Sequence, residues 1–514
     1  MRRRQLLTAL SATAVSACAA AIAPSPSASP TSAPTTSPTI APTVRPTATP
    51  ASPPNWSALR AQLAGTLVEA ATPGYDMARV LYNVRFDAIR PQAIAVCSSV
   101  ADVQACVRFA RATALPLALR SGGHSYAGWS TGAGLVIDVS QMSAISVGSG
   151  SVTVGAGARL IDVYDAVARA GAGIAAGSCP TVGITGLTLG GGVGVLTRAW
   201  GLTSDQLTNV DIVTADGELR HCDANSEPDL FWALRGGGGG NFGVVTALRF
   251  ATHPVGDLAI GFLTFPWSRA AAVLSGWQAW IGAAPDALWS TLHLEGGPTP
   301  FVSVHAVHVG SAAEIKTQLD GLVAAVGPPD YRESGNRTYR DVMLLEAGCL
   351  GRSVAACHLK GTTPTGELAR ETFVAKSIVA PRALSVDAIG ALVDGIATSS
   401  ATGVSAAILI DALGGAAARI APDATAFPHR SARAIIQLYS GGLATNGGAS
   451  IDWLRETFAK ARPLIGTGAY VNYIDADLAD WADAYYGANL TRLRAVKKRY
   501  DPDRVFEFPQ AIPS

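Results

Sequence analysis

Charged side chains are scarce in this chain of 514 residues. Asp, Glu, Lys and Arg make up only 15 % of it, and the formal net charge is +1. Nucleic acids and other highly charged partners are attracted by a strongly charged surface, so we expect no nucleic-acid partner and no acidic partner. A small neutral ligand fits this composition better. The length predicts roughly two to four folding units.

Two phosphate-binding signatures are also missing. There is no G-x-x-x-x-G-K-[ST] loop, and the glycine runs show no G-x-G-x-x-G spacing within a clear βαβ unit. A Walker loop and a Rossmann dinucleotide site are therefore disfavoured. Glycine is nevertheless dense in residues 120–128, 176–207 and 232–245. Such runs let backbone amides approach a pyrophosphate closely, although they also occur in ordinary loops.

The first 54 residues contain no acidic side chain. Arginines at positions 2–4 precede a small apolar stretch, residues 6–22, which is shorter than the roughly 20 strongly apolar residues of a spanning helix. We therefore predict an export signal over residues 1–23. "RRRQLL" resembles a twin-arginine signal, and "VSAC" resembles a lipobox that would place a lipid on Cys18. The alternative is an ordinary cleavable signal.

Residues 24–54 are almost entirely Pro, Ser, Thr and Ala. Such a segment buries too little apolar surface to offset its ordering entropy, so we predict a disordered, extended tether. With a lipid on Cys18 it would hold a folded body at a membrane surface outside the cytoplasm. Without the lipid, the protein would be a secreted enzyme with a disordered leader.

Seven cysteines occur, at positions 18, 97, 106, 179, 222, 349 and 357. Export permits disulfides, and the two close pairs, Cys97 with Cys106 and Cys349 with Cys357, are candidates. Spacing alone does not decide how cysteines are paired. Cys179 and Cys222 have no obvious local partner.

The body of the chain has an α+β pattern in three parts. Residues 55–255 alternate short apolar runs, typical of strands at 93–99, 115–124, 134–140 and 151–157, with helical segments at 101–113 and 159–171. Residues 256–460 contain strands with one polar face and Ala-rich helices, which indicates an antiparallel sheet with helices on one face. Residues 461–514 read as a strand, a loop and a helix that becomes basic toward its end.

Four motifs, taken in order, carry a resemblance to a known family. They are "RSGGHSY" at 120–126, "GSCPTVGITGLTLGGGVG" at 177–194, "YVNYID" at 470–475 and "YYGANLTRLRAVKKRYDP" at 485–502. Together they resemble the berberine bridge enzyme-like oxidases, FAD enzymes of the vanillyl-alcohol oxidase and p-cresol methylhydroxylase superfamily. The resemblance implies an FAD-binding domain built from residues 55–255 and 461–514, with an inserted substrate-binding domain, residues 256–460.

The resemblance also implies how the flavin is held. The family histidine that carries FAD through the flavin 8α-methyl carbon corresponds to His124, and a neutral imidazole is a competent nucleophile. Cys179 corresponds to the cysteine that, in a subset of the family, bonds to flavin C6. From the residues alone, His124 is equally well a histidine in a turn and Cys179 a small buried thiol. Val182 falls at the oxygen gatekeeper, where valine is typical of oxidases and leucine of dehydrogenases.

Tyr473 corresponds to the family's catalytic base, and Tyr126 to a tyrosine on the substrate side that could assist it. A tyrosine titrates near about 10, so Tyr473 needs a nearby positive charge or hydrogen bonds to ionise. Tyr470 would point to the opposite face of a regular strand. Each tyrosine is otherwise an ordinary core residue. Gln437 and Tyr439 share one face of a predicted strand that points into the substrate cleft.

Further residues are expected beside the flavin. Asn489 corresponds to a family residue near it, and the segments expected to line FAD contribute Arg120, Ser121, Gly122, Gly123, Ser125, Gly183, Gly186, Gly190, Gly191, Gly192, Gly243 and Val245. No metal is expected.

The resulting hypothesis is an exported, monomeric flavin oxidase. It would oxidise an alcohol, a sugar or oligosaccharide at its anomeric hydroxyl, with O2 as acceptor and H2O2 as product. The alternatives are a flavin-dependent dehydrogenase, an oxidative cyclase of a natural product, and a surface lipoprotein that binds a ligand without catalysis.

Overall fold

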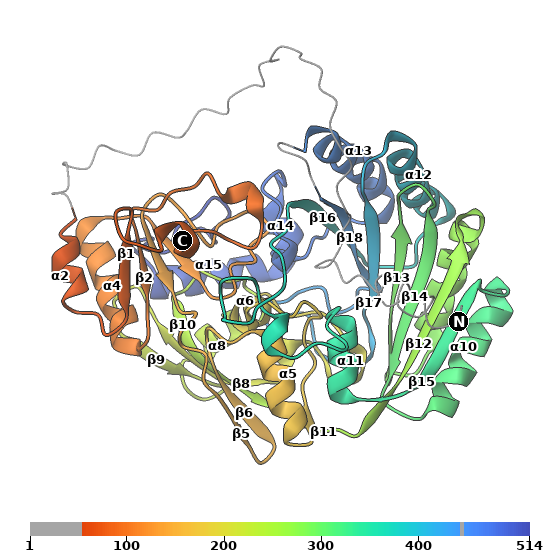
Figure 1. Ribbon diagram of the computed structural model, residues 1–514, viewed down its shortest axis with the longest axis horizontal. Helices are drawn as coiled ribbons and strands as arrows, with labels where there is room; N and C mark the ends of the chain where they lie inside the picture. Colours follow the sequence, from red (N-terminus) through yellow and green to blue (C-terminus); the bar gives the residue numbers. More distant parts are fainter. Residues whose placement is uncertain (1–53, 443–446) are drawn as a thin grey trace, which may run out of the picture.

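A computed structural model describes residues 54–442 and 447–514 of the chain (Figure 1). The predicted export signal with Cys18, and the predicted tether as far as residue 53, lie outside the described residues. No helix in the described part of the chain is long and apolar enough to cross a membrane.

The chain forms two bodies that lie side by side (Figure 1). The first contains a four-stranded sheet, in which β2 and β3 both run parallel to β4 and β1 runs antiparallel to β2. In spatial order its strands are β1 (Thr66–Glu69), β2 (Ala93–Val96), β4 (Leu135–Asp138) and β3 (Leu117–Arg120). Helix α4 (Val100–Thr113) follows β2 and begins at a capping box made by Ser99 and Asp102.

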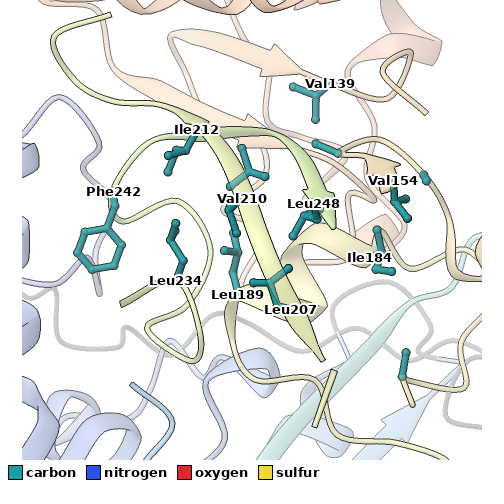
Figure 2. Close-up of a cluster of buried hydrophobic side chains, with 14 of the residues drawn as sticks. Val139, Val154, Ile184, Leu189, Leu207, Val210, Ile212, Leu234, Phe242 and Leu248 are labelled. Carbon is teal, nitrogen blue, oxygen red and sulfur yellow. The ribbon is translucent and has the colours of Figure 1, made fainter. Parts of the chain in front are cut away.

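A second, five-stranded antiparallel sheet completes this body. Its spatial order is β5 (Ile145–Gly148), β6 (Ser151–Gly155), β10 (Val244–Ala251), β8 (Leu207–Val213) and β9 (Leu219–Cys222). Figure 2 shows Val210, Ile212 and Leu248 of this sheet in one cluster with Ile184 and Leu189. These two residues begin and end helix α6 (Ile184–Leu189). The core therefore fixes the glycine-rich loop on either side of α6.

Early and late segments of the described part of the chain share this first core. Buried side chains of α14 (Trp481–Tyr486) and α15 (Leu490–Tyr500), with Phe506 and Ile512 beyond them, belong to the same cluster as the two sheets. Other elements of this body are α2 (Trp56–Arg60), α3 (Tyr75–Ala78), α5 (Leu160–Arg169), α7 (Thr197–Trp200), α8 (Pro228–Ala233), β7 (Ala172–Gly173) and β11 (His253–Pro254).

The second body is a seven-stranded sheet in which every neighbouring pair is antiparallel. Its spatial order is β15 (Tyr331–Thr338), β12 (Asp257–Pro266), β14 (Phe301–His308), β13 (Leu288–Glu295), β17 (Ala407–Ala412), β18 (Ala434–Gly441) and β16 (Phe373–Ala380). Helices pack on one face of this sheet and share a core with it, namely α9 (Ala270–Ala283), α10 (Ala312–Val326), α12 (Val386–Thr402) and α13 (Gly448–Ile465). The predicted α+β class, with a helix-covered antiparallel sheet, is confirmed.

Alternation along these strands decides which side chains face the other body. On β13, Leu288, Leu292 and Leu294 join the core under the helices. Trp289, Thr291 and His293 therefore point to the opposite face, because successive strand residues alternate. Helix α11 (Tyr339–Glu346) lies on that opposite side, between the two bodies (Figure 1).

One expectation about local structure needs correction, and the structure decides between the two candidate disulfides. Residues 471–473 form a short 3-10 helix instead of a strand. Of the two candidate disulfides, Cys349–Cys357 is formed, whereas Cys97 and Cys106 are both reduced and buried. These two thiols pack in the first core, where cysteine behaves as a small apolar side chain.

Candidate active site

A cavity of about 310 Å³ lies where the loops of the first body meet the face of the seven-stranded sheet that helices α9, α10, α12 and α13 do not cover. Most of the predicted site residues line it. They are Arg120, Ser121, Gly122, Gly123, His124, Ser125, Tyr126, Cys179, Val182, Gly183, Gly186, Gly243, Val245, Gln437 and Tyr473. Residues from both ends of the chain and from the sheet between them thus meet around one space.

The two glycine loops at the cavity are pressed against each other. A Cβ atom added to Gly122 would lie 2.1 Å from the backbone nitrogen of Gly183, so a side chain is excluded there. The adjoining Ser121 is tied down as well. The hydroxyl of Ser121 donates to the carbonyl of Ala156 at 2.6 Å, and the guanidinium of Arg159 donates to the carbonyl of Ser121 at 2.8 Å. The loop that carries His124 is therefore fixed by its backbone.

Other glycines leave open space beside the backbone in the cavity wall. Gly186 lines the cavity, and a Cβ atom added to it would meet nothing within 4 Å. Gly239 also lines the cavity, and the nearest atoms to such a Cβ lie 4.0 Å away. Space at these positions is what a bulky dinucleotide that lies against the backbone requires. The residues present therefore fit FAD.

His124 has the chemical state that a nucleophile needs. Burial, together with the positive charge of Arg159, lowers the pKa of its imidazole to about 3, so the ring is neutral. Its Nε2 atom lies 2.9 Å from the hydroxyl of Thr181, and its ring stacks on Tyr82 with 4.1 Å between centroids. Cys179 lines the same cavity. Both predicted attachment residues are thus brought to one cavity.

Tyr473 and Tyr126 form a stacked pair, with ring centroids 5.2 Å apart and planes inclined by 14°. The side-chain amide of Gln437 donates to the hydroxyl of Tyr126 at 2.9 Å. Burial raises the pKa of Tyr473 well above its usual value, and neighbouring groups, including Tyr126 and Asp411, raise it further. Tyr473 is therefore a strong base once ionised, but it is neutral when the pH is near 7.

Tyr470 lines the cavity together with Tyr473, so the expectation that the two point to opposite faces is wrong. The physical reason is the 3-10 turn over 471–473, in which residues three apart lie on the same side. The two rings meet edge to face at 5.1 Å. The hydroxyl of Tyr470 accepts hydrogen bonds from the backbone N–H groups of Gly192, at 3.1 Å, and Val193, at 3.0 Å. Its role is to hold the glycine loop.

The remaining predicted residues are not among those lining the cavity. Tyr439 donates its hydroxyl to Glu371 at 2.8 Å. Asn489 donates to the carbonyl of Pro422 at 2.8 Å, which ties α15 to a distant loop. Local backbone geometry instead requires glycine at positions 190, 191 and 192. A Cβ atom on Gly190 would lie 2.1 Å from the Asn472 side-chain oxygen, and the φ angles of Gly191 and Gly192 are +108° and +82°.

Sequence reasoning missed much of the polar wall that the seven-stranded sheet supplies. The register places Asp411 of β17 opposite Thr291 of β13, and Thr291 opposite His305 of β14. Burial raises the pKa of Asp411. The missed lining residues from this side are Trp289, Thr291, His293, His305, Glu346, Leu409 and Asp411. The sequence did contain a signal for these residues, namely polar side chains at alternate positions of otherwise apolar strands.

Two polar atoms in this wall have no hydrogen-bond partner among the described residues. They are the indole nitrogen of Trp289 and one carboxylate oxygen of Glu346, both fully buried. An unpaired buried donor or acceptor costs about 1–3 kcal/mol, so both are suited to contact a polar ligand. In the described part of the chain, no group of three or more His, Cys, Asp or Glu side chains could hold a metal ion.

Comparisons with known proteins agree with this site. Residues 91–223 match the FAD binding domain model, and residues 469–513 match the model described as berberine and berberine like. The chain is 34 % identical over 466 residues to YgaK of Bacillus subtilis (strain 168), described as an uncharacterized FAD-linked oxidoreductase. That alignment covers 88 % of this chain and 98 % of YgaK.

Xylooligosaccharide oxidase of Thermothelomyces thermophilus is 30 % identical over 453 residues, which are 82 % of this chain and 87 % of that enzyme. Among solved structures, Physcomitrella patens BBE-like 1 superimposes with a TM-score of 0.82 at 29 % identity. This likeness covers 89 % of this chain and 98 % of that one.

The fold and the cavity define an FAD-dependent oxidoreductase with a two-part cofactor domain and an inserted substrate domain. Within that class, the chain belongs to the berberine bridge enzyme-like family of FAD-linked oxidases.

Proposed function

We propose that this protein is an exported carbohydrate oxidase with covalently bound FAD, which oxidises a CH–OH group with O2 as acceptor. The observation that carries the proposal is the polar wall opposite Tyr473. Gln437, Asp411, Thr291 and His305 all line the cavity from the sheet. A substrate with several hydroxyl groups can pair with such a wall, whereas an apolar substrate would leave it unpaired at a cost.

In the proposed reaction, Tyr473 accepts the proton of the substrate hydroxyl. FAD held in this cavity would supply the acceptor for the hydride on the carbon that bears this hydroxyl, and the two electrons and two protons removed from the substrate would reduce O2 to H2O2. Tyr126 holds the ring of Tyr473 by stacking, and Gln437 fixes the hydroxyl of Tyr126. The proton and the hydride leave together or in quick succession, and Tyr473 accepts the proton in its ionised form, which is a small fraction near pH 7.

A sugar oxidised at its anomeric hydroxyl, giving a lactone, is the substrate that we propose. The relatives at 30 % identity named xylooligosaccharide, chitooligosaccharide and glucooligosaccharide oxidase support this class. The test is H2O2 release from xylobiose, cellobiose and coniferyl alcohol at equal concentrations. Peroxide from coniferyl alcohol alone would refute the sugar assignment. Rapid reduction of the flavin by a sugar, followed by slow reoxidation in air, would indicate a dehydrogenase. This result would contradict the oxidase activity that valine at position 182 predicts.

His124 and Cys179 are proposed as the two flavin attachment residues. A neutral imidazole and the presence of both residues at one cavity support this proposal. The test is acid precipitation followed by a denaturing gel read for flavin fluorescence. Flavin should stay on the wild-type chain and on His124→Ala and Cys179→Ala, and should be lost only from the double variant. A wild-type chain that sheds all its flavin would refute covalent attachment.

Export and lipid attachment at Cys18 are proposed from the sequence of the first 54 residues. Cell fractionation of the full chain tests the export, with Arg3→Lys combined with Arg4→Lys as the variant that should stay in the cytoplasm. Mass spectrometry of the N-terminal peptide tests the lipid, with Cys18→Ala as its control. A cleaved N-terminus without a lipid would refute lipid attachment and indicate a secreted enzyme.

A further inference from the structure

The imidazole of His124 is held by two side chains that stand outside the cavity. The ring of Tyr82 lies parallel to it, with 4.1 Å between centroids and 17° between planes. The hydroxyl of Thr181 lies 2.9 Å from its Nε2 atom. His124 lines the cavity, whereas Tyr82 and Thr181 are not among the lining residues, and each is only 4 % exposed. Two residues that do not line the cavity therefore fix one face and one nitrogen of the His124 ring.

Main-chain hydrogen bonds position these two residues independently of their side chains. The N–H of Tyr82 donates to the carbonyl of Gly123 at 3.1 Å, and the carbonyl of Tyr82 accepts from Glu371 at 3.2 Å. On the other side, the carbonyls that flank Thr181, at positions 180 and 182, accept from the start of α5 at 3.1 and 3.0 Å. A substitution of either side chain should therefore leave the backbone path in place.

Both rings of the stack are neutral. Burial and the charge of Arg159 lower the pKa of His124 to about 3, while burial and the Glu371 carboxylate raise the pKa of Tyr82 above its usual value. Neither ring changes its charge over the range in which the enzyme would work. The stack and the Thr181 contact therefore give the imidazole one orientation across that range.

We propose that Tyr82 and Thr181 are positioning residues that hold the His124 imidazole for attachment of FAD, an inference that rests on the proposed flavin bond at this histidine. In the attachment reaction, a bond forms between an imidazole nitrogen and the 8α carbon of the flavin. One C–H bond of that methyl group and one N–H bond of the imidazole break. The two protons and two electrons released reduce O2, the acceptor of the proposed oxidase, to H2O2.

Neither residue forms or breaks a covalent bond in this step, so each acts through the orientation of the His124 ring. Loss of the stacked ring or of the hydroxyl frees the imidazole to rotate away from its productive orientation. A stacked aromatic pair and a single hydrogen bond are each worth about 1 kcal/mol, which corresponds to attachment that is about threefold to tenfold slower for each loss.

The experiment uses the full chain in a Cys179→Ala background, so that His124 is the tether under test. The protein is produced under riboflavin limitation, FAD is added, and the flavin that stays on the acid-precipitated chain is followed with time. Tyr82→Leu and Thr181→Val should attach about threefold to tenfold more slowly. Tyr82→Phe and Thr181→Ser, which keep the ring and the hydroxyl, should attach at the parent rate.

Phe109→Leu serves as the matched control for loss of ring packing. It removes a contact with Trp56, at 5.4 Å between centroids, and does not line the cavity. This variant should attach flavin at the parent rate. If Phe109→Leu slows attachment as much as Tyr82→Leu does, the effect is one of general packing and the positioning role is overturned.

The remaining outcomes separate this inference from the proposed function. If the Cys179→Ala parent retains flavin at His124 and all four variants match its rate, the positioning role is overturned while the His124 bond stands. If the parent itself sheds all its flavin, the covalent bond at His124 is refuted, and the inference falls with it. Mass spectrometry of the peptide that carries His124 identifies the attachment residue in each case.

Discussion

Replacing Tyr473 by phenylalanine removes one oxygen atom from the wall of the cavity and little else. Among the described residues the hydroxyl of Tyr473 has no hydrogen-bond partner, so its loss leaves no donor or acceptor unpaired. The ring contacts with Tyr126, at 5.2 Å, and Tyr470, at 5.1 Å, remain. We therefore expect the variant to keep its fold, its flavin and a melting temperature close to that of the wild type.

The loss should appear in the chemical step. A positioned general base contributes about 100-fold to 10,000-fold, equivalent to about 2.7–5.4 kcal/mol of activation free energy. Tyr473→Phe should lower kcat by this factor. The assay is the rate of flavin reduction by xylobiose under anaerobic conditions, followed by stopped-flow absorbance, so that reoxidation by O2 does not contribute. A rate within threefold of the wild type would refute the assignment of Tyr473 as the base.

Tyr470→Phe is the matched control, because it makes the same chemical change three residues earlier. The hydroxyl of Tyr470 accepts from Gly192 and Val193. Its removal leaves two buried N–H groups unpaired, at a cost of about 1–3 kcal/mol each. We expect a fall in thermal stability with a smaller effect on flavin reduction. The opposite pattern, a stable Tyr470→Phe with a greater loss of reduction rate, would exchange the two roles.

Buried groups carry four further predictions. Because burial raises the pKa of Tyr473, the deprotonated fraction is small near pH 7 and kcat/KM should rise, by up to about tenfold per pH unit, as pH increases toward 10; a profile that falls over this range would contradict the proposal. Folding stability should be unaffected by this group below pH 10 and decrease above it, since its folded pKa exceeds its unfolded value. Lys376 donates to both oxygens of buried Asp475 at 2.8 Å, so Lys376→Met should cost about 3–5 kcal/mol in urea unfolding, and Lys376→Met with Asp475→Asn markedly less. Cys349→Ser removes the disulfide to Cys357, which is 8 residues away, and should lower the free energy of unfolding by about 2.5 kcal/mol. Equal unfolding midpoints of the wild type with and without reductant would refute this.

Local sequence signals located much of the first body correctly. Helix α4 begins at its capping box, where the Ser99 hydroxyl accepts from Asp102 and the Asp102 carboxylate accepts from Ser99. Helix α5 ends at Arg169, and Gly171 adopts a φ of +68° just beyond it. Such signals are readable because the residues that satisfy the helix ends are neighbours in the sequence.

Other features could not be read in this way. The sequence predicts a strand early in residues 461–514, whereas residues 471–473 form a 3-10 turn. Its conformation depends on distant partners, because Tyr470 must reach the N–H groups of Gly192 and Val193. Likewise, the close spacing of Cys97 and Cys106 does not show that both thiols are packed in the core.

The sequence by itself determined the class of protein, its cofactor motifs and the residues that line one side of the cavity. The glycines and His124 stand in short motifs, where each residue meets a requirement of its own backbone or its own chemistry. Such requirements can be recognised from neighbouring residues in the sequence. Only the tertiary structure decided the polar wall that faces them. Asp411 is distant in sequence from Thr291 and His305, and the three become neighbours through the register of β17, β13 and β14. Register is fixed by the burial of whole strand faces against the helices, a property of the assembled sheet that no single segment contains.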